Sequence, residues 1–368
     1  MRPVSPDDVG VIVDGLDTAW RHRTVGAVPI GAAGLKARLA HVRVTNEQLS
    51  VLSSAFLEER RAQAKGILGE GAYADEEVQF FLLPVPGSIA ALYRWQNGYA
   101  IVLSLGLIEI LRLSSVAGQL HSALERLRHS AAVKSALGAQ TFARTVTLLT
   151  RMTAYINASA ALSHLEARPV PDVLGGLDTA TRHRAEVVLE AAIMFVLLHE
   201  LGHVKFQRKG HCSGCLSADV QWEFAVPEAL DVHKEEELFA DRFALDAVPP
   251  GFRLALSHAA CLLLQLHTYV DTLRDDGERQ HPLAVNRLMA MQHHAGAGAS
   301  LDTGHQALQV AISLGARLWA KGGQKASSIG RLEALRRFVE SEKNFDWRPL
   351  REALVALSCG DRTGHVRT

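Results

Sequence analysis

A metal-binding pattern stands at residues 199–203, which read His-Glu-Leu-Gly-His. The apolar residues 191–198 directly before it predict a helix that is buried in the core. Histidines four positions apart lie on one face of a helix, so both imidazoles can bind the same metal ion. Glu200 follows the first histidine, where it can take a proton from a water molecule at the metal. The spacing therefore predicts a hydrolytic metal site rather than a polar helix end exposed to solvent.

A catalytic zinc site needs a third protein ligand and an open position for water. The next acidic segment supplies candidates, since Glu237 and Asp241 are four positions apart on one helix face and have apolar neighbours. We predict Glu237 as the third ligand. We predict that Asp241 accepts the second ring N–H of a ligand histidine and so fixes its orientation. The adjacent Glu235 and Glu236 are predicted to be exposed charges.

A third element, His281-Pro282 followed by Arg287, would by itself indicate only the start of a helix. Together the three elements resemble those of gluzincin metallopeptidases, and most of all the pattern of the CAAX-prenyl endopeptidase and HtpX-type family. The resemblance implies a zinc-dependent peptidase in which Asp241 supports the metal site. The residue roles that it implies are zinc ligation by His199, His203 and Glu237, proton transfer by Glu200, and contact with substrate or oxyanion by His281 and Arg287.

The chain also resembles, more loosely, the phage-exclusion Lit-type peptidases of bacteria, which implies a role in defence. The segment from Trp95 to Leu107 resembles the strand that precedes the active-site helix in the HtpX-type family. We expect an extended peptide substrate to pair with the strand near Tyr99–Leu105.

The composition excludes several classes of partner. The 39 Lys and Arg residues balance 39 Asp and Glu residues, which argues against general binding to nucleic acid or to an anionic membrane surface. The first residues lack an apolar signal region, and the apolar runs are too short for a membrane span, so we expect neither. Four cysteines in 368 residues do not make a disulfide scaffold, and we expect a cytoplasmic protein.

The Cys212-Ser-Gly-Cys215 segment leaves two interpretations open: a loop with two ordinary thiols, or a disulfide that senses redox state or seals the site. The pattern Gly-Leu-Asp-Thr-Ala-x-Arg-His-Arg occurs twice, at residues 15–23 and 176–184. We interpret both copies as helix N-termini with a solvated Arg/His face.

The fold is predicted to be mainly α-helical with a small antiparallel sheet, an α+β protein with a zincin-like metallopeptidase core. The sheet is expected to contain the strand Val78–Leu83 and a hairpin of Ile89–Trp95 and Tyr99–Leu105, because Asn97-Gly98 between apolar runs favours a tight turn. Helices are expected over 45–66, 107–113, 116–165, 179–209, 227–247, 252–273, 283–293, 305–321 and 329–357. The expected regions are an N-terminal part of unassigned role (1–85), the core (86–295, with a helical insertion at 110–178) and a C-terminal helical part (296–368).

These observations predict a soluble zinc-dependent endopeptidase that hydrolyses a protein or peptide substrate. One alternative is a defence or toxin-type protease that stays silent until a regulatory protein partner triggers it. Another is a non-catalytic regulatory module that the metal stabilises. The second alternative leaves Glu200 without a purpose, since a structural zinc site is usually closed by four ligands.

Overall fold

The computed structural model describes the chain in separate stretches. These are residues 78–83, 90–95, 98–128, 131–166, 179–208, 232–273, 284–294 and 328–362, together with Ala62 and Ser88. Several predicted features lie outside the described residues: the helix at 305–321, both cysteines of the Cys-Ser-Gly-Cys segment, and His281. Of the helix expected at 45–66, only Ala62 is described, and it is helical.

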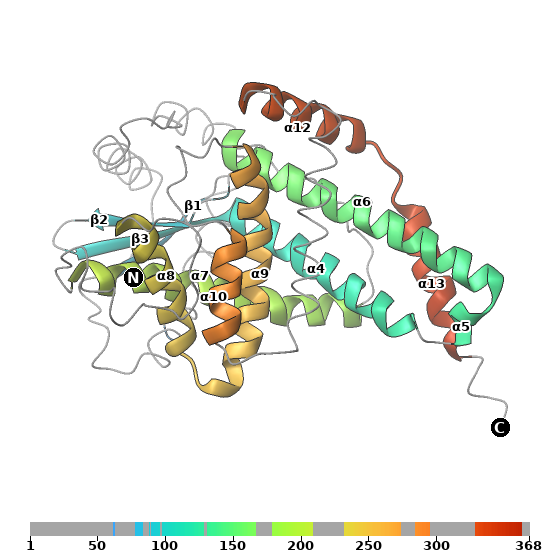
Figure 1. Ribbon diagram of the computed structural model, residues 1–368, viewed down its shortest axis with the longest axis horizontal. Helices are drawn as coiled ribbons and strands as arrows, with labels where there is room; N and C mark the ends of the chain where they lie inside the picture. Colours follow the sequence, from blue (N-terminus) through green and yellow to red (C-terminus); the bar gives the residue numbers. More distant parts are fainter. Residues whose placement is uncertain are drawn as a thin grey trace, which may run out of the picture.

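Three strands form one sheet in the order β1-β3-β2 (Figure 1). They are β1 (Val78–Leu83), β2 (Ala90–Trp95) and β3 (Gly98–Ser104). The β2–β3 pair is the expected antiparallel hairpin, with Trp95 opposite Gly98. The β1 strand adds on the other side of β3 in parallel, with Val78 opposite Tyr99. The predicted α+β class is confirmed.

The predicted position of the substrate is wrong, because β3 is the central strand. Its backbone is paired with β1 on one side and with β2 on the other. A peptide can add to a sheet only at an edge that still has unpaired N–H and C=O groups. The strand near Tyr99–Leu105 therefore cannot pair with an extended substrate.

Helices make up most of the remaining described structure. They are α4 (Leu105–Leu127), α5 (Ala131–Lys134), α6 (Ala136–Glu166), α7 (Thr179–Arg208), α8 (Val232–Asp246), α9 (Pro250–Leu273), α10 (Ala284–His294), α12 (Ser328–Glu342) and α13 (Arg348–Arg362). The first begins directly at the end of β3, where the Ser104 hydroxyl accepts a hydrogen bond from Leu107 N at 3.1 Å. This cap satisfies one of the free N–H groups of the first turn. The bounds expected for the helices 107–113 and 116–165 are wrong, because α4 covers the first and the start of the second, and α5 and α6 cover most of the rest.

The α7 helix lies at the centre of the fold and packs against α4, α8, α9 and the strands β2 and β3. Residues 192–198 are buried, as predicted from their apolar run. By length and composition alone, the segment His183–Phe206 would also suffice to cross a membrane. However, 72% of its apolar window is buried inside the protein, which is typical of a core helix.

Three apolar clusters hold the helices together, and α4 contributes to each of them. The largest joins the sheet to α4, α7, α8, α9 and α10. A second joins α6 to α9 and α12 around Ile110, and a third joins α4 to α6 and α13 around Leu113. Figure 1 shows the sheet at one end of the molecule and α5 and α13 at the other. The site-bearing helices thus rest on one core, and the C-terminal helices on the other two.

The C-terminal helix expected at 329–357 is in fact two helices, α12 and α13, and the prediction of one continuous helix is wrong. Pro349 lies in the first turn of α13, where its missing N–H costs nothing, whereas inside a longer helix it would remove a hydrogen bond. Asp346 accepts a hydrogen bond from Arg348 N at 3.1 Å at this restart. The bend is tied to α6 by Arg151, which donates from Nη2 to Glu342 Oε1 at 2.9 Å and lies 3.6 Å above the Phe345 ring.

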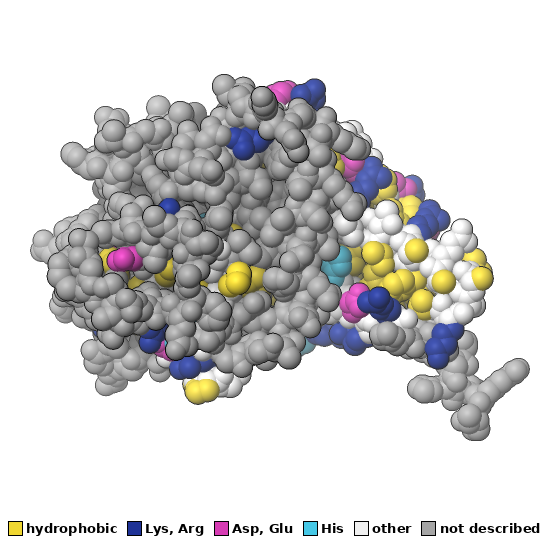
Figure 2. Space-filling view, viewed as in Figure 1, with side chains coloured by type: hydrophobic (Ala, Val, Ile, Leu, Met, Phe, Trp, Pro, Cys, Tyr) yellow, Lys and Arg dark blue, Asp and Glu magenta, His cyan; other side chains and the backbone are white. Residues whose placement is uncertain are grey.

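Apolar side chains reach the surface at the end of the molecule formed by α5, α6 and α13 (Figure 2). The exposed large apolar residues include Leu137 of α6 and Val355 of α13. This surface belongs to the end opposite the sheet and is separate from the polar cluster described next.

Candidate active site

Two imidazoles of α7 face each other across one turn of the helix. The Nε2 atoms of His199 and His203 are 3.1 Å apart, and the two rings meet edge to face. The Phe195 ring stacks on His199 from the turn before, with ring centroids 5.9 Å apart. The buried helix α7 thus carries two polar side chains on one face. Their burial costs free energy unless other groups form hydrogen bonds or ion pairs with them.

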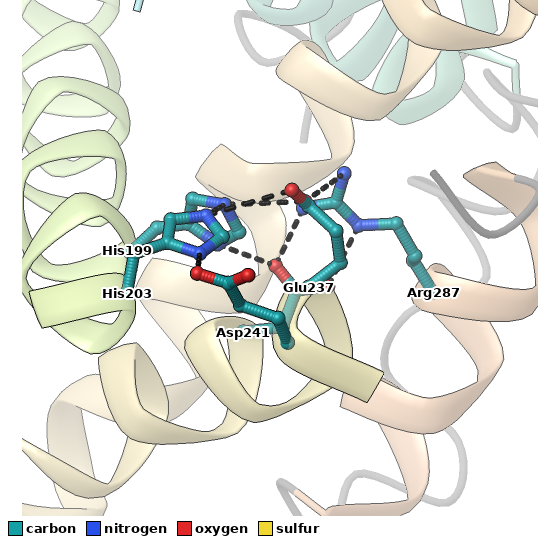
Figure 3. A network of polar contacts seen from close by, with 6 residues as sticks. His199, His203, Glu237, Asp241 and Arg287 are labelled. Atoms are coloured by element: carbon teal, nitrogen blue, oxygen red, sulfur yellow. Dashed lines mark hydrogen bonds and ion pairs between the residues drawn. The ribbon is translucent and has the colours of Figure 1, made fainter. Parts of the chain in front are cut away.

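The α8 helix supplies a carboxylate that contacts the Nε2 atoms of both imidazoles. Glu237 Oε2 lies 3.4 Å from His199 Nε2, and Glu237 Oε1 lies 3.5 Å from His203 Nε2. Its side chain is 10% exposed. Two imidazole nitrogens and one carboxylate therefore point to a common centre (Figure 3).

Asp241, one turn further along α8, contacts the other side of the first imidazole. Asp241 Oδ1 lies 3.0 Å from His199 Nδ1, which leaves His199 Nε2 facing the common centre. The distance is that of an ion pair or a hydrogen bond, although the alignment does not meet the angle of a hydrogen bond. The contact agrees with the arrangement predicted from the spacing of Glu237 and Asp241.

Arg287 of α10 closes the cluster from the side opposite to the histidines (Figure 3). Its guanidinium donates two hydrogen bonds to Asp241, from Nε at 2.8 Å and from Nη2 at 2.7 Å. The third nitrogen, Nη1, lies 3.3 Å from Glu237 Oε2. Such a two-point contact fixes the carboxylate in direction as well as in position. With 2% exposure, Arg287 is one of the largest fully buried side chains described.

The charges of the cluster shift the protonation equilibria of its members. Burial by itself would lower the pKa of His199, but the carboxylates of Asp241 and Glu237 outweigh burial and raise this pKa to about 10. Burial by itself would raise the pKa of Asp241, but Arg287 outweighs it and holds that pKa below its usual range. Without a metal the site therefore keeps negative carboxylates beside a positive imidazole and a guanidinium.

Glu200 lies on the same turn as the histidines and is also buried, with 5% exposure. One ligand atom from each of His199, Glu200 and His203 lies within 4.8 Å of the other two, a grouping that could hold a metal ion. Glu237 contacts both Nε2 atoms and so adds a second carboxylate to this grouping.

The structure brings together every predicted site residue that it describes, and His281 lies outside the described residues. Sequence reasoning missed Glu236, which was interpreted as an exposed charge. Glu236 Oε1 lies 3.1 Å from His203 Nδ1, and its side chain is only 16% exposed. The requirement that a ligand histidine have a partner for its second nitrogen could have found it.

A sequence profile of the peptidase U49 family matches residues 110–301, which is more than half of the chain. The chain belongs to the peptidase U49 family. The matched range includes α7, α8 and α10, so all the described residues of the cluster lie within the part of the chain shared with U49 peptidases. No curated protein and no solved structure is similar enough to count as a match.

Membership of the U49 family confirms the prediction of a peptidase, and the His-Glu-His group could hold a metal ion. The finer resemblance to the CAAX-prenyl endopeptidase and HtpX-type family stays a prediction. The match also begins at residue 110, so U49 peptidases share the helices α6 and most of α4 that lie between the sheet and α7.

Proposed function

We propose that this U49 peptidase is a soluble zinc-dependent endopeptidase whose ligands are His199, His203 and Glu237. The observation that carries the proposal is the spacing of the three donor groups, 3.1 Å between the nitrogens and 3.4 and 3.5 Å from nitrogen to oxygen. Ligands at 2.0–2.1 Å in a tetrahedron are about 3.3–3.4 Å apart, as ordinary geometry requires. The donor set therefore fits a zinc ion with little movement.

The chemistry of the donors supports zinc over a hard cation such as calcium or magnesium. Two imidazoles and one carboxylate are typical of catalytic zinc, whereas calcium and magnesium prefer oxygen ligands. When both imidazoles are neutral, as metal binding requires, the carboxylates of the buried Glu200, Glu237 and Asp241 carry more negative charge than Arg287 neutralises. A divalent cation at the common centre would balance this charge.

In the proposed reaction the side chains around the metal have different roles. When bound, the zinc ion would polarise the scissile carbonyl and lower the pKa of the attacking water. Glu200 takes a proton from that water and passes it to the leaving amine. Asp241 holds the His199 imidazole with Nε2 toward the centre, and this fixes the geometry before substrate binds.

The contacts of Arg287 favour a positioning role over direct contact with the oxyanion. All three of its guanidinium nitrogens lie within 3.3 Å of a carboxylate oxygen of Asp241 or Glu237. A donor that is committed to two carboxylates has little left to offer a developing negative charge. We therefore propose His281 for the oxyanion and Arg287 for holding α8 in place.

The outer edge of β2 is the better candidate for substrate pairing, since β3 is paired on both sides. The β2 strand packs against α7, the helix that carries the histidines. A peptide added there in extended conformation would run beside the zinc helix. This proposal replaces the earlier expectation for the strand at 99–105.

The Glu200→Gln variant tests the proposed function. We expect it to bind one zinc ion per chain, as wild type does, and to lose cleavage of a casein-type substrate. Glu186→Gln is a matched control, because Glu186 is an exposed glutamate on the same helix, with 58% side-chain exposure. Undiminished cleavage by Glu200→Gln would contradict the assignment of the base. Zinc binding without cleavage by wild type would favour the non-catalytic module, and a proteomic comparison of cells expressing wild type and Glu200→Gln would reveal the substrate.

A further inference from the structure

Each of the two imidazoles has a carboxylate of α8 on the nitrogen that faces away from the common centre. His199 Nδ1 lies 3.0 Å from Asp241 Oδ1, and His203 Nδ1 lies 3.1 Å from Glu236 Oε1. The second contact also meets the geometry of a hydrogen bond. Glu237 lies between these two carboxylates along α8 and contacts both Nε2 atoms. A single helix thus contacts both nitrogens of both rings.

We propose that Glu236 is a positioning residue of the metal site, which holds the Nδ1–H of His203 so that Nε2 is the metal-binding nitrogen. A neutral imidazole carries its proton on one nitrogen or the other, and the hydrogen bond to one nitrogen decides which. Acceptance of the Nδ1 proton by a carboxylate also makes Nε2 a stronger donor to a metal. The proposal rests on metal binding by the proposed function, but not on catalysis.

The position of Glu236 on α8 explains why this glutamate contacts His203 and Glu235 does not. Residues 235–237 are three consecutive glutamates, and successive residues of a helix are rotated by about 100° from each other. Glu237 points to the common centre, and Glu236 reaches the outer nitrogen of His203. Glu235 makes no hydrogen bond or ion pair that is recorded within the described part of the chain. One glutamate in three therefore lies at the right angle for His203.

The two outer carboxylates also differ in their surroundings. Asp241 is tied down by two hydrogen bonds from Arg287 and is 1% exposed. The Glu236 side chain is 16% exposed and lies at the rim of the cluster. Because water competes more strongly at the rim, Glu236 is expected to orient its histidine less rigidly than Asp241 does.

Zinc affinity of the full chain, measured by competition with a chelator, tests the proposal. We expect Glu236→Ala to weaken zinc binding by about 10- to 100-fold, the range found for carboxylates that hold ligand histidines. Glu236→Gln keeps an acceptor oxygen without the charge and is expected to weaken binding less. Glu235→Ala, which removes the same charge one residue earlier, is expected to leave the affinity unchanged.

A second readout separates positioning from a general effect of charge. In the zinc-loaded protein, the His203 Nδ1 proton should give a downfield, slowly exchanging NMR signal that Glu236→Ala loses and Glu235→Ala keeps. An affinity of Glu236→Ala equal to that of Glu235→Ala would overturn the proposal, as would weaker binding with the signal retained. Zinc binding without peptidase activity would refute the proposed function and leave this inference standing, whereas failure of wild type to bind zinc would refute both.

Discussion

Gly202 of α7 lies directly against the backbone of Ala240 of α8. A Cβ atom placed on Gly202 would come within 2.7 Å of Ala240 Cα and within 3.2 Å of its carbonyl oxygen. Cβ atoms do not approach other atoms this closely in real structures, so α7 and α8 can pack at this distance only because residue 202 has no side chain. The close approach brings the carboxylates of α8 within reach of His203, one residue after Gly202, and of His199, three residues before it.

The first prediction follows from this contact. Gly202→Ala should push α8 away from α7, destabilise the protein by about 1–3 kcal/mol and weaken zinc binding. The clash is with backbone atoms, which cannot move aside as a flexible side chain could. Urea unfolding and chelator competition measure the two effects.

Gly118→Ala is the matched control for this prediction. Gly118 lies inside α4, and a Cβ there would meet no atom within 4 Å. Alanine favours a helix over glycine by about 0.5–1 kcal/mol, so Gly118→Ala should be neutral or stabilising. If both variants behaved alike, helix propensity would explain the result and the contact with Ala240 would not matter.

Local features of the fold could be predicted from the sequence. The hairpin around Asn97-Gly98 and the α7 helix, expected at 179–209, follow from turn residues and from apolar periodicity, which are properties of short segments. The parallel addition of β1 to β3 could not be predicted, because it depends on a contact between segments that do not adjoin in the sequence. The same reason explains the wrong prediction that a substrate would pair with β3.

For the site too, features within one helix could be predicted from the sequence, and contacts between helices could not. The spacing of His199, His203, Glu237 and Asp241 within their own helices predicted which side chains share a face, and the structure brings these faces together. The partners of Glu236 and Arg287 depend on how α7, α8 and α10 pack, which helix periodicity does not define. Glu236 was for this reason interpreted as an exposed charge.

The second prediction concerns the buried pair of Arg287 and Asp241, measured in the presence of a chelator. Arg287→Met should destabilise the metal-free protein by about 3–5 kcal/mol, because it removes both hydrogen bonds of the guanidinium to the buried Asp241 carboxylate and leaves only the His199 imidazole beside it. Asp241→Asn should also destabilise. The double variant should lose less than the sum of the two single losses, since neither charge is then left alone.

Arg348→Met serves as the control for this pair. Arg348 makes a comparable two-point contact with Asp346, from Nε and Nη2 at 2.9 Å each, but the two side chains are 84% and 51% exposed. Exposed pairs contribute little because water screens them, so this variant should unfold like wild type. Additive losses in the Arg287 and Asp241 cycle would show that the two residues do not stabilise each other.

The third prediction tests Glu237 as a zinc ligand. Zinc at one hundred times its dissociation constant should stabilise the wild-type protein by about 2.7 kcal/mol, and a chelator should remove this gain. Glu237→Ala and His199→Ala should show no stabilisation by zinc, and Glu235→Ala should show the full gain. Glu237→Gln is a second variant that keeps an oxygen to accept from Arg287, so it tests whether the effect of Glu237→Ala comes only from the lost contact with Arg287. A zinc effect that is lost in His199→Ala but kept in both Glu237 variants would exclude Glu237 as the third ligand.

The fourth prediction concerns His121 of α4, which lies far from the proposed metal ligands in the sequence and packs against α6. Its Nε2 is 3.0 Å from Thr153 Oγ1, and that hydroxyl donates to Leu149 O at 2.9 Å. The hydroxyl proton is thus in use, and His121 must donate to Thr153 from Nε2. Burial lowers the pKa of His121 from 6.5 to about 4, and the nearby Glu125 only partly opposes this shift.

Because the folded-state pKa lies below the unfolded one, the unfolded chain binds more protons between pH 6.5 and about 4. The contribution of His121 to the free energy of unfolding is therefore complete above pH 6.5 and is lost as the pH falls toward 4, by up to about 3 kcal/mol. His121→Gln should remove this loss, so that urea unfolding at pH 7.5 and pH 4.5 differs less than in wild type. His183→Gln, in which the replaced imidazole has 77% side-chain exposure, should keep the wild-type difference. An identical pH dependence in wild type and His121→Gln would show that the buried imidazole is not the group that loses stability in acid.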